Sequence, residues 1–305
     1  MSSPIVECVP NFSEGVDRRV VEAIVAAMHV PGVELLDWSM DAAHNRSVVT
    51  VAGEPSAVVE SAVRGVGKAA ELIDLTTQQG VHPRMGAADV VPFVPVSGIK
   101  LEQCVMLARH AGLEMWRRYA VPAYFYEAAA SRPDRVNLED VRRGQFEGLR
   151  DAARRESTRR PDVGGPGLHP TAGASAVGAR KLLVAYNIFF DSTDVAAARA
   201  IAREIRASSG GMKSVKALGL LVDGRAQLSM NITDFHTTSL SQVFDTVAHL
   251  APRYRIAPVE GEIIGLIPEA ACERESEWMR QLIGFDPATK ILEQRLANPM
   301  NWPGE

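Results

Sequence analysis

The histidine at position 82 has the most suggestive surroundings of any titratable residue in this chain. It lies in residues 80–87, which read GVHPRMGA and separate an apolar helical pattern from an apolar strand pattern. Pro83 restricts His82 to an extended backbone, and Gly86 permits the close approach of another segment. An imidazole two positions from the Arg84 guanidinium is suited to proton transfer near an anion. The alternative is a loop histidine that only makes structural hydrogen bonds.

A second polar group, formed by Asp41, His44 and Asn45, precedes a segment rich in valine and threonine. Polar side chains at the mouth of a sheet can orient a ligand, but the aspartate and asparagine could equally just form a turn. The other histidines and the three cysteines are widely spaced and do not show the spacing of metal ligands. We therefore predict no metal site.

A glycine-rich segment at residues 162–173 reads DVGGPGLHPTAG. It superficially resembles a phosphate-binding loop, but it lacks the Lys-Ser/Thr pair and precedes a strand pattern instead of following one. The missing pair and the wrong order of elements exclude a nucleotide-binding loop here. The segment is either a ligand-contacting loop at a junction between two domains or a plain linker.

The elements that must position these residues follow from hydrophobic periodicity. In the first part of the chain, strand patterns at residues 5–9, 33–37, 46–52 and 90–96 alternate with two helical patterns, in the order βαββαβ. The same order returns in the second part. Strands are predicted there at 181–190, 215–222, 226–232 and 256–267, with a two-residue hairpin turn at Asp223-Gly224. The sequence therefore predicts an α+β fold of two ferredoxin-like (βαββαβ) subdomains.

Between these repeats we predict a helix at residues 101–119, a short strand at 121–126 and an arginine-rich connector at about 130–164. The connector is either a solvated helical surface whose arginines pair with glutamates, or a rim that attracts anions. Its nine arginines are Arg132, Arg135, Arg142, Arg143, Arg150, Arg154, Arg155, Arg159 and Arg160.

Composition restricts the class of protein. The 305 residues suggest about two domains, and a hydrophobic fraction of 46% with 23% charged residues is typical of a soluble globular protein. The net charge of −4 argues against a dedicated nucleic-acid binder. No apolar run is long enough to suggest a membrane span or a secretory signal, and the odd number of cysteines fits free thiols. A cytoplasmic location is expected.

Several motifs together resemble the formiminotransferase family. They read ECVPNFSEG at 7–15, HNRSV at 44–48, HPRMGA at 82–87, GARK at 178–181 leading into AYN at 185–187, and VKA at 215–217. The chain resembles the stand-alone glutamate formimidoyltransferase form, without a cyclodeaminase domain. The resemblance implies transfer of the formimidoyl group of N-formimidoyl-L-glutamate to N5 of tetrahydrofolate, giving 5-formimidoyltetrahydrofolate and L-glutamate in histidine degradation. Tetrahydrofolate is then a co-substrate, and no metal is needed.

The resemblance also implies an architecture and a set of site residues. Subdomains at residues 1–179 and 180–305 would face each other across a substrate groove, and the protein would form a homodimer. His82 would be catalytic, by proton transfer at the attacking and departing nitrogens. The implied substrate-binding residues are Arg84, Asp41, His44, Asn45, Asn11, Lys181 and Asn187. The implied folate-binding loop comprises Gly164, Gly165, Pro166, Gly167, Leu168, His169, Pro170, Thr171, Ala172 and Gly173.

Other functions remain open at this level. They are a related folate-dependent formyl transfer with glutamate, hydrolysis of formimidoyl compounds, and non-catalytic binding of folate or another ligand on the same scaffold.

Overall fold

The computed structural model describes residues 3–42, 44–80 and 83–304, and the chain divides into two compact units. The first unit comprises Met1–Arg180 with Pro299–Glu305, and the second comprises Lys181–Asn298. The C-terminal tail returns to the first unit, where the backbone N–H of Met300 donates to the Leu35 carbonyl at 2.8 Å and the Trp302 ring stacks on His29. This placement differs from the predicted boundaries, in which residues 180–305 all belong to the second subdomain.

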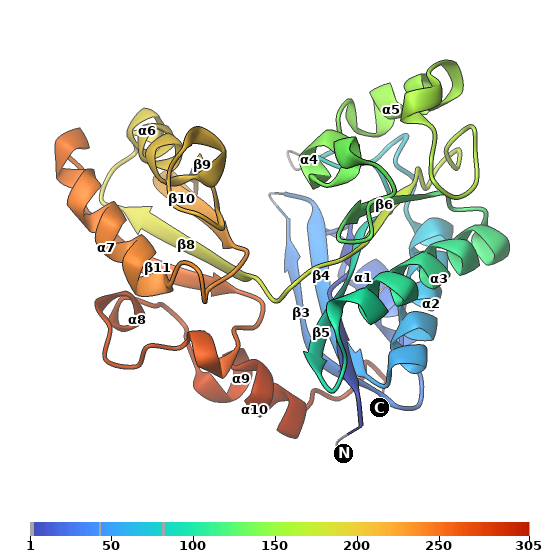
Figure 1. Cartoon of the computed structure of the whole chain (residues 1–305), viewed down its shortest axis with the longest axis horizontal. Coiled ribbons are helices and arrows are strands. Elements are labelled where there is room, and N and C mark those ends of the chain that lie inside the picture. The colour runs from blue at the N-terminus through green and yellow to red at the C-terminus, as the bar shows by residue number, and fades with distance from the viewer. Residues whose placement is uncertain (1–2, 43, 81–82, 305) are drawn as a thin grey trace. The chain divides into compact units, whose positions relative to one another are not determined.

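The first unit is a mixed sheet with helices packed on one face (Figure 1). Its strands are β1 (Ile5–Cys8), β2 (Asn11–Phe12), β3 (Val33–Asp41), β4 (Arg46–Gly53), β5 (Ala88–Ser97), β6 (Ala123–Glu127) and β7 (Ser175–Ala179). Its long helices are α1 (Arg18–Ala27), α2 (Pro55–Leu72) and α3 (Leu101–Tyr119). The helix predicted at 101–119 is confirmed, and the strand predicted at 121–126 is confirmed with a shift of one to two residues.

The strand order of the first sheet is β1-β4-β2-β5-β7-β6, with β3 added at β4. β1 lies within the first predicted strand and β2 follows beyond its predicted end; both pair antiparallel with β4 and β5. β7 was not predicted. It pairs parallel with both β5 and β6, and thereby anchors the end of the glycine-rich segment in the sheet.

The arginine-rich connector contains the short helices η1 (Pro133–Arg135), α4 (Leu138–Val141) and η2 (Ser157–Arg159) and the longer α5 (Gln145–Arg155). Arg135 is buried in an ion pair with Asp162, and Arg142 pairs with Asp89 of β5. Exposed Arg143 pairs with a neighbouring aspartate on its own segment. These partners are aspartates, not the glutamates expected for a solvated helical surface. Arg142 joins the connector to β5, and Asp162, the partner of Arg135, accepts the N–H of Phe125 on β6.

The second unit is a four-stranded antiparallel sheet in the order β11-β8-β10-β9, with a core between the sheet and two helices (Figure 1). Its elements are β8 (Val184–Phe190), α6 (Val195–Ile205), β9 (Val215–Val222), β10 (Arg225–Ile232), α7 (Leu240–Leu250) and β11 (Pro258–Ile264). Three short helices follow: α8 (Glu277–Arg280), α9 (Pro287–Lys290) and α10 (Leu292–Ala297). The short 3-10 helices η3 (Ala207–Ser209), η4 (Ala251–Tyr254) and η5 (Glu269–Ala271) complete the unit.

The predicted hairpin between β9 and β10 is confirmed. Asp223 and Gly224 both have positive φ angles, of 48° and 73°, as a two-residue turn matched to the twist of a hairpin requires.

Candidate functional site

Three segments that are distant in the sequence meet at one place in the first unit. The backbone N–H of Ser13 donates to the Ala87 carbonyl at 2.8 Å, and its hydroxyl donates to the Gly86 carbonyl at 2.7 Å. The N–H of Gly15 donates to the Asn45 side chain, also at 2.8 Å. The motifs at 7–15, 44–48 and 82–87 are therefore joined by direct hydrogen bonds, which the sequence spacing alone does not indicate.

Asp41, His44 and Asn45 form the turn between β3 and β4. The Asp41 carboxylate accepts the His44 backbone N–H at 2.9 Å and lies 2.5 Å from the His44 Nδ1. Asn45 has a positive φ of 49° and donates from its side chain to the Gln79 carbonyl at 2.6 Å. These residues do form the turn, their role as ligand-orienting groups stays a prediction, and the turn also bonds the segment that leads to position 82. Asn11 lies on β2 and donates to the Val9 carbonyl.

His82 and its neighbour at position 81 lie outside the described residues, so the central prediction of the sequence analysis stays a prediction. What the structure describes is the chain on either side. Arg84 is 8% exposed, and its Nη2 lies 3.0 Å from Glu147 Oε1. Its guanidinium also donates to the Gln78 carbonyl at 2.8 Å and to the Gln78 side chain at 2.5 Å. Arg84 thus ties together the segment that contains His82.

The end of the glycine-rich loop forms backbone hydrogen bonds on both sides of position 82, with Leu75 before it and with Met85 and Ala87 after it. On one side the N–H of Leu75 donates to the Thr171 carbonyl at 2.9 Å. On the other, the N–H of Ala87 donates to the Ala172 carbonyl at 2.8 Å, and that of Ala174 donates to the Met85 carbonyl at 3.0 Å. We call these three backbone hydrogen bonds the loop clamp.

Glycines make the loop clamp sterically possible. A Cβ at Gly86 would lie 2.2 Å from the Ala174 carbonyl oxygen, and one at Gly173 would lie 2.2 Å from the Met85 carbonyl oxygen. Gly173 also has a positive φ of 70°. These glycines are required by close backbone approach, which is the role that the sequence analysis gave to Gly86.

The glycine-rich loop and the His82 motif both belong to the first unit, because the whole of residues 164–173 falls within it. Gly164 and Gly165 have positive φ angles, and Gly164 packs against the Trp116 ring of α3. The loop therefore presents backbone groups without side chains over several residues. Such a surface suits a planar, hydrogen-bonding ligand that approaches the chain closely.

Sequence reasoning missed a charged group beside these motifs. Asp89, which is 3% exposed, accepts the backbone N–H of Met85 at 2.7 Å and pairs with Arg142. Burial lowers the pKa of the nearby Arg46, the cation at Arg142 lowers it further, and the Asp89 charge opposes both. The available signal was Asp89 itself, an acid within the otherwise apolar run of β5.

Two predicted substrate-binding residues lie in the second unit. Lys181 forms an ion pair with Asp234 at 2.8 Å, and the Asn187 side chain on β8 donates to Glu262 at 3.4 Å. Both are engaged within their own unit.

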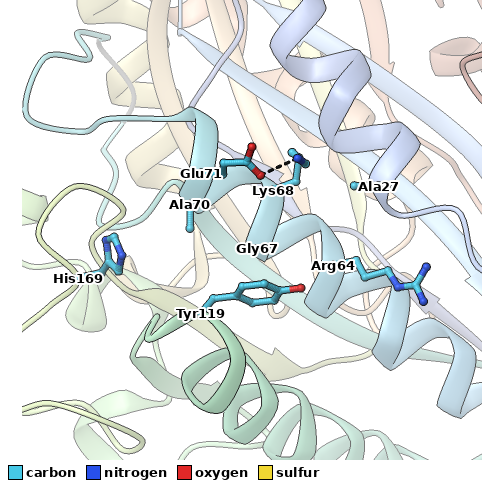
Figure 2. A pocket seen from close by; sticks show the side chains of 8 residues that line it. All are labelled: Ala27, Arg64, Gly67, Lys68, Ala70, Glu71, Tyr119 and His169. Carbon is cyan, nitrogen blue, oxygen red and sulfur yellow. Dashed lines mark hydrogen bonds and ion pairs between the residues drawn. The ribbon is translucent and has the colours of Figure 1, made fainter.

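A pocket of about 470 Å³ opens beside the glycine-rich loop in the first unit (Figure 2). Figure 2 shows His169 of the loop and Tyr119 of α3 at the same pocket as the Lys68–Glu71 ion pair of α2. The lining residues are Ala27, Arg64, Gly67, Lys68, Ala70, Glu71, Tyr119 and His169. Among the sequence-predicted site residues, His169 is the one that this pocket shares.

Two searches of the described residues bear on the class of site. No cluster of three or more His, Cys, Asp or Glu side chains is arranged to hold a metal ion in the described ranges. In the same part of the chain, no helix combines the length and the apolar character needed to cross a bilayer.

Comparison with known proteins gives consistent matches. Residues 5–180 match the family model described as the formiminotransferase domain, N-terminal subdomain, and residues 185–281 match the formiminotransferase domain. A glutamate formimidoyltransferase from Streptococcus pyogenes is 44% identical over 295 residues, which cover 96% of this chain and 98% of that protein. One from Thermoplasma acidophilum is 42% identical and covers 97% and 99%. A formimidoyltransferase-cyclodeaminase from Mus musculus is 36% identical, with 95% and 60% covered.

Proposed function

The chain belongs to the formiminotransferase family, and on that premise we propose that it is a glutamate formimidoyltransferase. It transfers the formimidoyl group of N-formimidoyl-L-glutamate to N5 of tetrahydrofolate and releases L-glutamate. Two relatives of that name match over nearly the whole of both chains, which supports the same activity for the protein as a whole. Its place is in one-carbon metabolism and histidine degradation.

One structural observation supports this function most directly. The three motifs at residues 7–15, 44–48 and 82–87 converge through the hydrogen bonds of Ser13 and Gly15, and the loop clamp adds the glycine-rich loop to them. A transferase needs its acid–base group beside the site that orients both substrates. Segments that meet in this way can provide such a site.

In this mechanism His82 is the acid–base residue. Tetrahydrofolate supplies the attacking nitrogen, N5. The His82 imidazole takes the proton that this nitrogen loses and returns a proton to the glutamate nitrogen as its bond to the formimidoyl carbon breaks. A pKa near neutral pH suits both roles, since the same group must accept a proton and donate a proton in one catalytic cycle.

The donor is proposed to bind beside His82, near the turn formed by Asp41, His44 and Asn45 and near Asn11. The carboxylates of formimidoylglutamate need cations. Arg84 can serve one only if the carboxylate replaces Glu147, whose side chain is 60% exposed and therefore free to turn into solvent. Lys181 and Asn187 of the second unit are proposed to complete the substrate site.

The folate is proposed to lie along residues 164–173. The positive-φ glycines of this loop have no side chains that would keep a ligand from the backbone, whose amides are proposed to bind the polar edge of a pterin ring. The wider architecture is likewise a proposal: two ferredoxin-like subdomains, divided near residue 180, face each other across the substrate groove in a cytoplasmic homodimer. The βαββαβ order of both units supports the first part.

A direct assay tests the function. The purified protein is incubated with formimidoylglutamate with and without tetrahydrofolate, and glutamate release is measured. Folate-dependent release is expected. Release without folate would point to a hydrolase, and no release with retained folate binding would point to a ligand-binding protein; either result would overturn the proposal. A formyl donor tested in parallel distinguishes formimidoyl transfer from the related formyl transfer, which would release glutamate from the formyl donor instead.

The role of His82 is tested by His82→Ala, with His110→Ala as a matched control on the exposed surface of α3. His82→Ala should lower turnover by about 10²–10⁴-fold, the usual contribution of general acid–base catalysis, and should leave folate binding intact. Near-normal turnover in that variant would remove His82 from the mechanism.

A further inference from the structure

The ring of His169 accepts hydrogen bonds from the loop that contains it. Its Nδ1 lies 3.0 Å from the backbone nitrogen of Ala172 and 3.4 Å from both the backbone nitrogen and the hydroxyl of Thr171. The His169 backbone also pairs with Gly173 in both directions, at 2.8 and 3.1 Å. One side chain thus closes the five-residue turn at the end of the glycine-rich loop.

The direction of these bonds assigns the proton on the ring. Backbone N–H groups can only donate, so His169 Nδ1 must be unprotonated and the neutral ring carries its hydrogen on Nε2. Burial lowers the pKa of His169, which favours the same neutral form. The charged and titratable groups that line the adjoining pocket with this ring are Arg64, Lys68 and Glu71 of α2 and Tyr119 of α3.

The His169 ring holds one peptide unit of the loop clamp, the one between Thr171 and Ala172. The N–H of this unit, that of Ala172, donates to Nδ1 at 3.0 Å, and its carbonyl, that of Thr171, accepts the N–H of Leu75. The next unit, whose Ala172 carbonyl accepts the N–H of Ala87, donates its Gly173 N–H to the His169 backbone carbonyl at 3.1 Å. Leu75 and Ala87 lie on either side of the segment that contains position 82. The ring therefore orients the peptide group that bonds the Leu75 side of that segment, and the His169 backbone bonds the group on the Ala87 side.

We propose that His169 is a positioning residue, whose Nδ1 fixes the Leu75 side of the loop clamp and thereby the start of the segment that carries His82. The effect on turnover rests on the proposed function, whereas the effect on the clamp does not. His169 needs no contact with either substrate for this role. The acceptor must stand at the position of Nδ1, because an acceptor further along the side chain cannot reach both N–H groups from the same backbone.

Three variants separate the two ring nitrogens. His169→Asn places an amide oxygen where Nδ1 lies, His169→Gln places its amide at the position of Nε2, and His169→Ala removes both. The first readout is hydrogen exchange at the amides of Ala172 and Leu75, measured in the wild type and in each variant, with Ala87 as an internal reference because its acceptor belongs to the peptide unit held by the His169 backbone. Thermal unfolding of the same samples checks that every variant is folded.

The Ala and Gln variants should exchange the Ala172 and Leu75 amides about tenfold faster than the wild type, the effect of losing one net hydrogen bond. The Asn variant should remain within about threefold of the wild type. Unchanged exchange in the Ala variant would overturn the proposal. So would recovery by Gln but not Asn, because it would assign the role to the Nε2 side of the ring, toward the pocket.

The second readout is steady-state kinetics with formimidoylglutamate and tetrahydrofolate. The Ala and Gln variants should lose about tenfold in kcat with little change in the KM for the donor, and Asn should restore kcat. A wild-type protein without transferase activity would refute the proposed function, while the exchange measurement would still test the clamp. Normal kcat in an Ala variant with a loosened clamp would refute the positioning role.

Discussion

Replacing Arg84 by alanine should destabilise the first unit, because this largely buried guanidinium bonds Gln78, on the other side of position 82, and Glu147 of α5. The side chain is 10% exposed. It donates twice to Gln78, at 2.5 and 2.8 Å, and once to Glu147 at 3.0 Å. A further contact, to the Leu75 carbonyl at 3.4 Å, is too long to add much.

The magnitude follows from these contacts. The two hydrogen bonds to Gln78 are worth about 1 kcal/mol each, and the exposed Glu147 pair adds about 0–1 kcal/mol because water and salt screen it. Arg84→Ala should therefore reduce the free energy of unfolding by about 2–3 kcal/mol. For a unit of this size that corresponds to a fall in Tm of about 5–10 °C. Glu147→Ala, the matched control, should cost less than about 1 kcal/mol.

Urea denaturation and thermal unfolding of the wild type and both variants measure these differences. A free energy of unfolding for Arg84→Ala within about 0.5 kcal/mol of the wild type would refute the structural role. The KM for the donor adds an independent check. If Arg84 binds a substrate carboxylate, Glu147→Ala removes the carboxylate that competes for its Nη2 and should lower that KM; if Arg84 only holds the segment, the KM should not change.

Three further outcomes follow from individual contacts. Gly173→Ala should cost about 2–3 kcal/mol, because its Cβ would meet the Met85 carbonyl oxygen at 2.2 Å and its φ is 70°; denaturant unfolding measures this. Ser13→Ala should cost about 1–2 kcal/mol in the same assay, since it removes a buried hydroxyl bonded at 2.7 Å. Hydrogen bonding to Arg118 lowers the pKa of Glu60, so this pair stabilises the fold at neutral pH and the gain is lost as the pH falls below the ordinary glutamate pKa. Glu60→Gln should therefore cost about 0.5–1 kcal/mol at neutral pH, and the difference from the wild type should vanish in acid.

Local patterns were sufficient to predict most of the elements. The helix α3 was predicted with its observed bounds, Leu101–Tyr119, and Pro122, which cannot continue a helix, follows shortly after its end. The hairpin at Asp223-Gly224 was equally predictable, since a two-residue turn between two strands needs positive φ angles. Both signals lie within a few residues of the element that they specify.

The strand β7 shows where local patterns fail. Ser175–Ala179 reads SAVGA, which has weak strand propensity and follows directly on the glycine-rich loop. It forms a strand because β5 and β6 lie on either side of it and supply parallel hydrogen-bond partners. Those partners come from elsewhere in the chain, so the pairing is decided by tertiary structure.

The candidate site divides in the same way. Residue types and order along the chain were enough to single out the motif at 82–87 and the glycine-rich loop, because glycine, proline and histidine constrain local geometry and chemistry in ways that sequence alone reveals. Sequence could not show that Arg84 points at Gln78 and Glu147, that Asp89 pairs with Arg142, or that His169 holds the loop clamp. A charged side chain on a loop can turn toward solvent, substrate or protein with similar local energy. Only the packing of the sheet, the connector and the loop against one another decides which partner it meets.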